Sequence, residues 1–401
     1  QPNQLTNINV LSGTTSVRQY NLTYTASPTT NRPLLTAVQE CGGSAGTDCL
    51  RPTNITYQYG AAGWSASATS SGLTGQYGLM HPDLNGDGIP DALYGKLSGS
   101  NITWYARIAS LSGYGTEIAT GATTTAGSNS SVIVGNFDGT GRAELLAGTS
   151  GSTLYAYKFN GSAFTSANTG IAASTARYAM DWDGDGLPDL VEYPSGVPAT
   201  VTVRRNTTTA GGAIAFSSSP QVVFTSPDQS AQLILTLPTL PVDFNGDGRG
   251  DMLVRTFRLG PKGISIFYDY AVLSNGASSS STVIDLNGAI DGASEGPGSA
   301  TVAVGDWNGD GCTDLVTPKE IFIADCTGHF NAILTNIPLM TGNNVPFPYP
   351  IQLIDVDGDG QTDLVYPDPA SNIWYVARST GAGVAAGTST GVAYSTLNGY
   401  G

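Results

Sequence analysis

One eleven-residue loop occurs six times in this chain of 401 residues, and it restricts what the chain can fold into. Five copies carry carboxylate or amide oxygens at loop positions 1, 3, 5 and 9, Gly at positions 4 and 6, and an apolar residue at position 2. Because Gly adopts positive φ without strain, such a loop can curl tightly and point alternate oxygens inward. We number the copies loop 1 to loop 6: DLNGDGIPDAL from Asp83, NFDGTGRAELL from Asn136, DWDGDGLPDLV from Asp181, DFNGDGRGDML from Asp243, DWNGDGCTDLV from Asp306 and DVDGDGQTDLV from Asp355.

These oxygens predict a binding site for Ca²⁺ in each complete loop. The ion takes about six to eight oxygen ligands at roughly 2.3–2.6 Å, more than neighbouring residues of a strand or helix can bring together. We therefore expect about five structural Ca²⁺ ions. The predicted side-chain ligands are Asp83, Asn85, Asp87, Asp91, Asp181, Asp183, Asp185, Asp189, Asp243, Asn245, Asp247, Asp251, Asp306, Asn308, Asp310, Asp314, Asp355, Asp357, Asp359 and Asp363, and the predicted main-chain carbonyl ligands at position 7 are Ile89, Leu187, Arg249, Cys312 and Gln361.

Loop 2 is a degenerate copy. It has Asn136 at position 1, Thr140 at position 5 and Glu144 at position 9, and this substitution of ligands does not favour metal binding. The loops resemble the first nine residues of an EF-hand loop, but an apolar sequence such as Leu-Val or Ala-Leu then follows directly. That sequence predicts a strand after each loop.

The charge of the chain agrees with metal sites. The formal net charge is −15, yet 19 of the 31 acidic residues lie in the six loops, which leaves 12 against the 16 Lys and Arg of the chain. Five bound Ca²⁺ ions would reduce the net charge to −5. Because carboxylates this close repel one another, we expect the metal-free loops to be loosened locally. The chain has no basic run with interleaved aromatic residues, so nucleic acid is not an expected partner.

The composition indicates a secreted all-β protein. Glu and Lys together number only ten, whereas Gly numbers 52, and this removes the usual residues of exposed helices. No apolar run is long enough for a membrane span, and the beginning at Gln1 does not resemble a signal peptide, which suggests a mature or excised chain. The four cysteines form two local pairs, Cys41 with Cys49 and Cys312 with Cys326, which favours disulfides and a secreted or cell-surface location over buried free thiols.

The spacing of the loops predicts the architecture. Successive loops begin 53, 45, 62, 63 and 49 residues apart, which suits one four-stranded blade of a β-propeller. A short apolar strand precedes each loop, a second strand follows it, and a third alternates aromatic and small residues, as in ITWYARI from Ile102 or TLYAYKF from Thr153. FNGSAFTSANTGIA from Phe159 has the pattern of a turn and a fourth, outer strand.

The segment before loop 1 has no calcium loop but has the strand pattern of a blade. VRQYNLTYT and PLLTAVQEC supply two strands, and ITYQYGAAGWSASA from Ile55 supplies two more. We therefore predict a single seven-bladed propeller domain over residues 1–401. In it, 17–70 form a degenerate blade, 75–380 form six blades, and 381–401, with GVAYSTL from Gly391, are a candidate ring-closing strand and tail. The alternative is six blades preceded by a small N-terminal β domain.

These residues carry two family resemblances. The loops with their flanking strands resemble FG-GAP or VCBS repeats, the units of integrin-α-type propellers and many bacterial secreted proteins, over about residues 75–380. YNLTYTASPTTNRPLLTAVQECG from Tyr20 and CLRPTNITYQYG from Cys49 are similar to the segment before the FG-GAP repeats in the B component of insecticidal toxin complexes and in SpvB-type and Rhs-type proteins. The resemblance implies a non-catalytic role in docking or gating beside a shell, although this chain has none of the tyrosine-aspartate repeats of that shell.

The sequence shows no catalytic constellation, so we do not predict an enzyme. Its two histidines, His81 and His329, are far apart, and we expect His81 to contact the backbone of loop 1. Arg249, Gly250 and Asp251 spell RGD, but Asp251 is a predicted metal ligand. We predict a calcium-stabilised, monomeric binding or scaffold module of a toxin-delivery or surface protein, with a protein or glycan partner at a propeller face. The alternatives are a lectin or adhesin and, less favoured, a polysaccharide-active enzyme.

Overall fold

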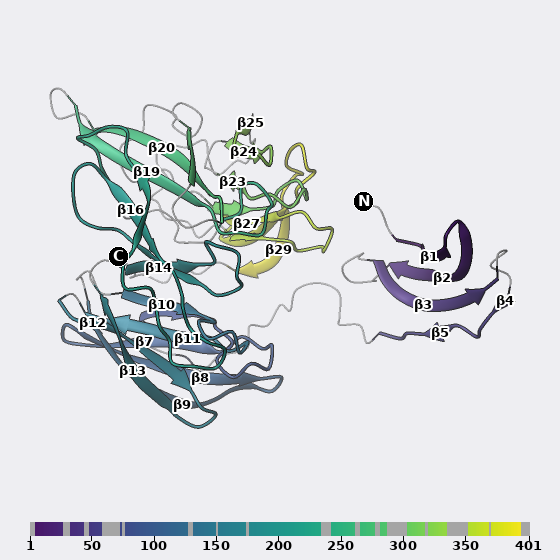
Figure 1. Cartoon of the computed structure of the whole chain (residues 1–401), viewed down its shortest axis with the longest axis horizontal. Helices are drawn as coiled ribbons and strands as arrows, with labels where there is room; N and C mark the ends of the chain where they lie inside the picture. The colour runs from purple at the N-terminus through teal and green to yellow at the C-terminus, as the bar shows by residue number, and fades with distance from the viewer. Residues whose placement is uncertain are drawn as a thin grey trace. The chain divides into compact units, whose positions relative to one another are not determined.

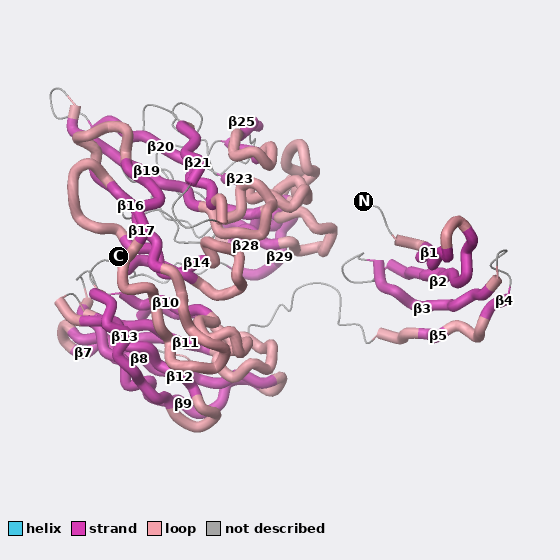
Figure 2. The backbone as a smooth tube through the Cα atoms, in the orientation of Figure 1, coloured by secondary structure: helices cyan, strands magenta, loops and turns pink. Residues whose placement is uncertain are grey.

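The computed structural model describes an all-β protein. The described residues are 5–26, 33–43, 48–57, 73, 77–126, 131–149, 151–173, 176–233, 242–260, 265–276, 281–286, 303–316, 320–334, 352–368 and 370–393, and none of these lies in a helix (Figure 2). The predicted fold class is confirmed at this level. Within the same residues no helix is long and apolar enough to cross a membrane.

The strands form seven antiparallel sheets within the described part of the chain (Figure 1). Six of these sheets have four strands that follow one another in sequence order, so that each strand pairs antiparallel with the next one in the chain. The first sheet contains β1 (Asn7–Ser12), β2 (Thr15–Ala26), β3 (Pro33–Gly42), β4 (Asp48–Cys49) and β5 (Thr53–Asn54), in the order β1-β2-β3-β4 with β5 beside β3.

Each of the other six sheets contains one of the six loops, between its first and second strands. These sheets are β6 (Tyr77–Met80), β7 (Ala92–Ser98), β8 (Asn101–Ser110), β9 (Gly113–Thr125); β10 (Ser131–Gly135), β11 (Glu144–Gly148), β12 (Thr153–Phe159), β13 (Phe164–Ala172); β14 (Ala176–Met180), β15 (Asp189–Glu192), β16 (Thr200–Arg204), β17 (Gln221–Thr225); β18 (Gln232–Leu233), β19 (Met252–Leu259), β20 (Ser265–Ser274), β21 (Ser281–Asp285); β22 (Ala303–Gly305), β23 (Asp314–Val316), β24 (Glu320–Ala324), β25 (Phe330–Leu334); and β26 (Gln352–Ile354), β27 (Asp363–Asp368), β28 (Ile373–Ala377), β29 (Thr388–Ala393). The predicted strands before and after each loop are confirmed.

Contacts between Cα atoms divide the chain into two compact units. One unit consists of residues 1–67, 305–311 and 333–401, and the other of residues 68–304 and 312–332. The described residues of the larger unit form four hydrophobic cores, and each core lies between two successive sheets. One core joins Leu93 of β7 to Leu145 of β11, and the next joins Leu146 of β11 to Leu190 of β15. The other two join β15 and β16 to β19 and β20, and β19 and β20 to β23 and β24.

The side chain at loop position 2 is buried in these cores. Leu84, Phe137, Trp182 and Phe244 are fully buried, and each belongs to the core between its own sheet and the next. Trp307 in the other unit is fully buried as well. Trp182 and Trp307, at position 2 of loops 3 and 5, are therefore core residues.

The N-terminal sheet differs from the predicted degenerate blade. β2 and β3 are the expected strands and pair antiparallel from Arg18↔Gly42 to Ala26↔Pro33. β4 and β5 are only two residues long, and Ile55–Tyr57, at the start of the expected third strand, lie outside any strand. The remainder of that expected pair, with Trp64, lies outside the described residues, and the number of blades stays a prediction.

The last sheet includes part of the expected ring-closing segment. β29 pairs with β28, and it contains residues 391–393 of the segment that begins at Gly391. These residues therefore belong to the outer strand of the last sheet, because β29 pairs with β28 at the end of the strand order. Residues 394–401 lie outside the described part of the chain.

The two predicted disulfides are present. Cys41 and Cys49 are joined across β3 and β4, and Cys312, at position 7 of loop 5, is joined to Cys326 after β24. The described residues contain no free cysteine.

Candidate metal centres

The two Gly residues of each loop make the tight curl possible. At positions 4 and 6 of all six loops, φ lies between 69° and 90°. In loop 1, Asp83 at position 1 then accepts main-chain hydrogen bonds from Gly86 at 2.7 Å and Gly88 at 2.8 Å. The same pair of bonds occurs in loops 3, 4, 5 and 6. The position 1 carboxylate is thus the centre about which each complete loop curls.

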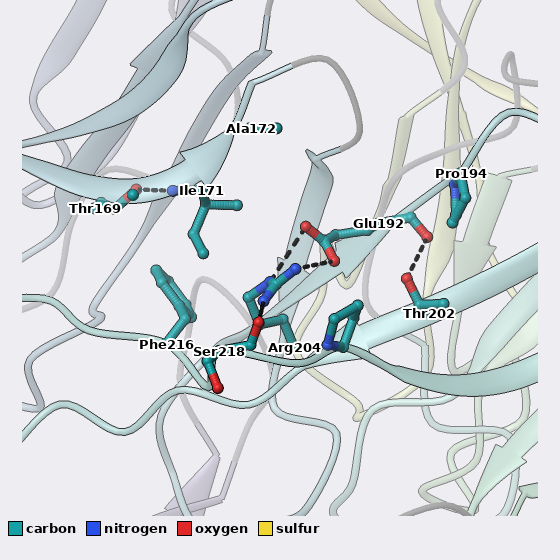
Figure 3. Close-up of a pocket in the computed structure, with 11 residues that line it drawn as sticks. Thr169, Ile171, Ala172, Glu192, Pro194, Thr202, Arg204, Phe216 and Ser218 are labelled. Atoms are coloured by element: carbon teal, nitrogen blue, oxygen red, sulfur yellow. Dashed lines mark hydrogen bonds and ion pairs between the residues drawn. The ribbon is translucent and has the colours of Figure 1, made fainter.

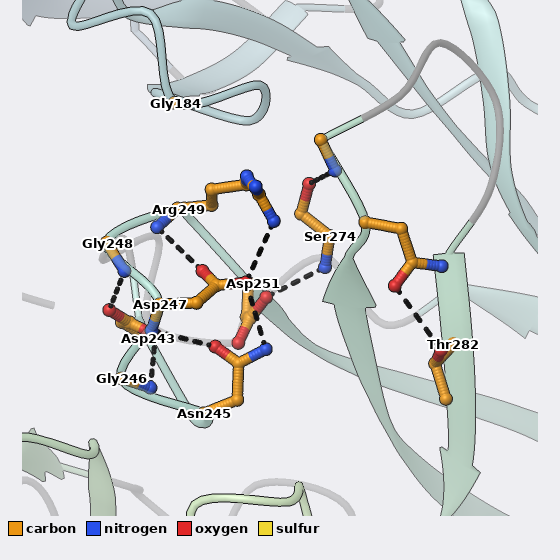
Figure 4. A network of polar contacts seen from close by, with 12 residues as sticks. Gly184, Asp243, Asn245, Gly246, Asp247, Gly248, Arg249, Asp251, Ser274 and Thr282 are labelled. Atoms are coloured by element: carbon orange, nitrogen blue, oxygen red, sulfur yellow. Dashed lines mark hydrogen bonds and ion pairs between the residues drawn. The ribbon is translucent and has the colours of Figure 1, made fainter.

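Positions 3 and 5 complete the inner rim of the loop. In loop 4, Asn245 accepts a hydrogen bond from the N–H of Asp247 at 3.1 Å, and Asp247 accepts one from the N–H of Arg249 at 2.9 Å (Figure 4). The amide of Asn245 also donates to the Asp247 carboxylate at 3.2 Å. These contacts hold the side chains at positions 1, 3 and 5 on one side of the loop.

Position 9 has a structural role that we did not predict. Asp251 is fully buried, and one of its oxygens accepts a hydrogen bond from the N–H of Ser274 at 2.8 Å (Figure 4). Its other oxygen accepts one from the N–H of Phe244 at 2.9 Å. Asp91, Asp189 and Asp363 likewise bind the N–H of loop position 2 and an N–H at the end of the third strand. The position 9 carboxylate therefore fastens the start of its loop to the third strand of the sheet.

Carboxylates of the predicted ligand set lie close together in loops 3 and 6. Oxygens of Asp181, Asp183 and Asp189 in loop 3 lie within 4.8 Å of one another, and so do those of Asp355, Asp357 and Asp359 in loop 6. Asp183 also has a buried carboxylate oxygen without a hydrogen-bond partner. Hard carboxylate oxygens gathered in this way match the donors that Ca²⁺ prefers.

The pKa values of the position 9 carboxylates also favour a bound cation. Burial, with a contribution from nearby carboxylates, raises the pKa of Asp189 and that of Asp251 to about 7. The same causes raise the pKa of Asp91 and Asp363. Such rises mean that negative charge is under-compensated in these loops, and a bound cation would relieve this cost.

Loop 2 has a different arrangement around a lysine. Lys158 of β12 places its Nζ 2.7 Å from an oxygen of Asp138 at position 3. Burial alone would raise the pKa of Asp138, but hydrogen bonds from Lys158 and Thr140 hold it below its usual value. Burial and the charge of Asp138 raise the pKa of Glu144 to about 7.

The raised pKa of Glu144 predicts a pH-dependent stability. The folded protein binds this proton more tightly than the unfolded chain, in which the pKa is near 4.5. The contribution of the group is therefore most favourable below about pH 4.5 and is lost as the pH rises through about 7. Glu144→Gln should raise the free energy of unfolding above pH 7 by up to roughly 3 kcal/mol, and change it little at pH 4.5. Urea unfolding at the two pH values measures this.

Glu117 is the matched control. Hydrogen bonds from Lys96 and Tyr94 lower its pKa, so Glu117→Gln should destabilise the protein at pH 8. An equal gain of stability in both variants would contradict the assignment to Glu144.

Loops 3 and 6 also have a cation beside position 3, and we did not predict these contacts. Arg205 lies 2.5 Å from Asp183, and Arg378 lies 3.1 Å from Asp357. The signal was available in the sequence, because each basic residue stands at the end of the third strand, a recurring element of the repeat. The pairing register was needed to align these positions.

Main-chain hydrogen bonds connect successive loops. The N–H of position 8 donates to the position 1 carbonyl of the preceding loop, as from Ala143 to Asp83 at 2.7 Å and from Gly250 to Asp181 at 2.6 Å. Thr313 and Thr362 donate in the same way to Asp243 and Asp306. Loop 3 has Pro188 at position 8 and has no N–H to donate, so its junction with loop 2 must be built differently.

The other sequence candidates do not form a second site. His81 is exposed and makes no hydrogen bond within the described part of loop 1, so the predicted contact to the loop backbone is wrong. The N–H groups of Gly86 and Gly88 bond to Asp83, and those of loop positions 2 and 7 bond to Asp91 and Asp87. His329 is exposed in a turn that Asp325 stabilises. Asp251 of the RGD sequence is buried, as its predicted role in the loop requires. The position 7 carbonyl ligands remain predictions.

A pocket of about 660 Å³ lies beside β13, β15 and β16, with Glu192 and Arg204 in its wall (Figure 3). Glu192 occupies position 12 of loop 3, where an EF-hand has a metal-binding Glu. Here its carboxylate points to the guanidinium of Arg204, with contacts of 3.2 and 3.3 Å. Arg204 also donates to the carbonyls of Ser217 and Ser218. The ion pair therefore braces the sheet.

The comparison with family models identifies the repeat. Residues 83–147 match the model of the FG-GAP-like repeat. This segment is thus similar to an FG-GAP-like repeat. It includes loops 1 and 2 in full, so the resemblance noted in the sequence is confirmed for the part of the chain that carries both a complete and a degenerate loop. No curated protein matches the chain.

Solved structures similar to the chain include a Tc holotoxin pore of Photorhabdus luminescens and two rhamnogalacturonan lyases. The holotoxin chain has 17% identity and a TM-score of 0.43, over 92% of this chain and 18% of its own length. The exotype lyase YesX has 13% identity and a TM-score of 0.35, over 94% and 90% of the two chains. The lyase YesW has 13% identity and a TM-score of 0.37, over 90% and 85%. This chain thus spans less than a fifth of the holotoxin chain.

Proposed function

We propose that this protein is a calcium-stabilised β-propeller that serves as a non-catalytic binding or scaffold module of a secreted or surface protein. The observation that carries the proposal is the repetition of one oxygen-lined loop in six successive sheets. Each of the four cores of the larger unit lies between neighbouring sheets, as blades require. The propeller, its closure and its blade count belong to this proposal.

Calcium is proposed as the resident ion of loops 1, 3, 4, 5 and 6. The residues that would hold it are the carboxylates and amides at positions 1, 3, 5 and 9, with the carbonyl of position 7. The ion would supply positive charge to loops in which burial raises carboxylate pKa values. Its role is structural, because the same side chains also fasten the loop backbone.

The setting that we propose is a toxin-delivery or surface assembly with a protein partner. This rests on the FG-GAP-like repeat and on the N-terminal segment whose sequence is similar to that of SpvB-type and Rhs-type proteins. The two disulfides support an oxidising, extracellular compartment.

Three measurements on the purified chain test this proposal. Calorimetric titration of metal-free protein should give about five Ca²⁺ per chain at dissociation constants of about 10⁻⁴ to 10⁻³ M. A glycan array should be silent with and without calcium, and specific calcium-dependent binding would instead favour a lectin. Incubation with rhamnogalacturonan should release no unsaturated products, and their release would overturn the non-catalytic role.

A further inference from the structure

The six sheets place one residue of the third strand beside each loop. Loop position 10 pairs with a known residue of that strand, such as Leu145↔Tyr157 in the second loop-containing sheet and Leu190↔Arg204 in the third. We call the next residue along the chain, which lies in the third strand or directly after it, the flank position. Across loops 1 to 6 the flank residues are Ile108, Lys158, Arg205, Leu273, Ile323 and Arg378.

The flank residue matches the residue at loop position 3 in every copy. Loops 2, 3 and 6 have Asp at position 3 and a basic flank residue, and the ion pairs are 2.7, 2.5 and 3.1 Å long. Loops 1, 4 and 5 have Asn at position 3 and an apolar flank residue. The additional carboxylate therefore occurs only where the protein supplies its own cation.

Loop 2 depends on its basic flank residue, Lys158, more than loops 3 and 6 depend on theirs. Asn136 and Thr140 stand where the complete loops have Asp, so Asp138 and Glu144 are the carboxyl groups left in the loop. The side chain of Asp138 is 6% exposed and that of Lys158 is 27% exposed, which places the ion pair mostly out of water. Removal of one partner from a pair so placed costs more than at an exposed ion pair, because it leaves the other charge buried and unpaired.

Lys158 also reaches beyond its own loop. Its Nζ donates a hydrogen bond to the carbonyl of Gly212, in the connection between β16 and β17 of the next sheet. The N–H of Gly211 donates to the carbonyl of Asp138 at 2.9 Å, and the amide of Asn206 donates to the carbonyl of Phe137 at 2.9 Å. These contacts occur at the one loop junction where Pro188 removes the main-chain bond between loops.

We infer that the ammonium of Lys158 is the resident cation of loop 2, where it replaces a metal ion and joins the second loop-containing sheet to the third. Loop 2 then stabilises the fold without a metal ion, whereas the other five loops bind calcium. Arg205 and Arg378 occupy the same flank position in their sheets. They neutralise the additional carboxylates at position 3 of loops 3 and 6, which are Asp183 and Asp357. This inference deepens the proposed calcium stabilisation and rests on it for the ion count, but the contribution of Lys158 to stability is independent of calcium.

The experiment compares Lys158→Met with Lys96→Met. Lys96 forms a 2.6 Å ion pair with Glu117 outside the loops, with its side chain 42% exposed, so its loss is the matched control. Thermal unfolding is recorded in EGTA and in Ca²⁺. The fall in Tm should be at least about twofold larger for Lys158→Met, and equal in the two solutions. Equal losses for the two variants would overturn the inference.

The calcium count supplies a second arm, and its first variant leaves Lys158 in place. Asp138→Asn should leave the number of bound Ca²⁺ ions unchanged, and the loss of one ion would show that loop 2 binds metal and overturn the inference. The triple change Asn136→Asp, Thr140→Asp and Lys158→Met should add one ion. If the wild-type protein binds no Ca²⁺ at all, the proposed calcium stabilisation fails, while the comparison of the two Lys variants in EGTA still decides the role of Lys158.

Discussion

Removal of calcium with EGTA should lower the Tm of this protein by on the order of 8 °C. A site at a tenfold excess of Ca²⁺ over its Kd contributes about 1.4 kcal/mol, so five sites contribute about 7 kcal/mol together. The fall in Tm is this free energy divided by the unfolding entropy. That entropy is about 2.1 cal/mol/K per residue, taken over 401 residues. The physical cause is repulsion among the loop carboxylates once the ion has left.

Differential scanning calorimetry of the same sample checks this expectation. Excess Ca²⁺ added after EGTA should restore the original Tm, which separates ion loss from damage. Mg²⁺ should restore less, because it demands a small octahedral site and gives up its water reluctantly. A melting curve that is unchanged in metal-free protein would contradict the role of calcium in stability.

Loss of the position 9 carboxylate should destabilise the fold even without metal. Asp251→Ala leaves the N–H groups of Phe244 and Ser274 without partners, and both residues are buried. Each unpaired buried donor costs about 1–3 kcal/mol, and removal of a buried charge recovers part of this. We expect the free energy of unfolding in EGTA at pH 8 to fall by about 2–4 kcal/mol.

Asp247→Ala is the control in the same loop. The Asp247 side chain is 29% exposed, and it accepts hydrogen bonds at the rim from Asn245 and Arg249. Its loss in EGTA should cost under about 1 kcal/mol, whereas in Ca²⁺ both variants lose a ligand. Urea unfolding in both solutions distinguishes the two positions. Equal losses in EGTA would mean that position 9 acts only as a metal ligand.

Only part of the candidate site could be predicted from the sequence. The spacing of Gly and oxygen-bearing residues was sufficient to predict the loops. Positive φ at two Gly residues and alternate inward oxygens depend only on the local sequence. The second role of position 9 is not local: the N–H of Ser274 lies 23 residues beyond Asp251 in sequence. The same holds for Lys158 and Asp138, which are 20 residues apart. Strand register brings these groups together, and register follows from sheet pairing.

The sequence by itself determined the all-β class, the strands on each side of the loops and the two disulfides. All of these follow from local periodicity or from repetition of one unit. Tertiary structure alone decided which cations face position 3, how Pro188 is compensated, and how short β4 and β5 are. The physical reason is that ion pairs and junctions between sheets depend on distances across neighbouring strands, and a repeat of sequence does not specify those distances.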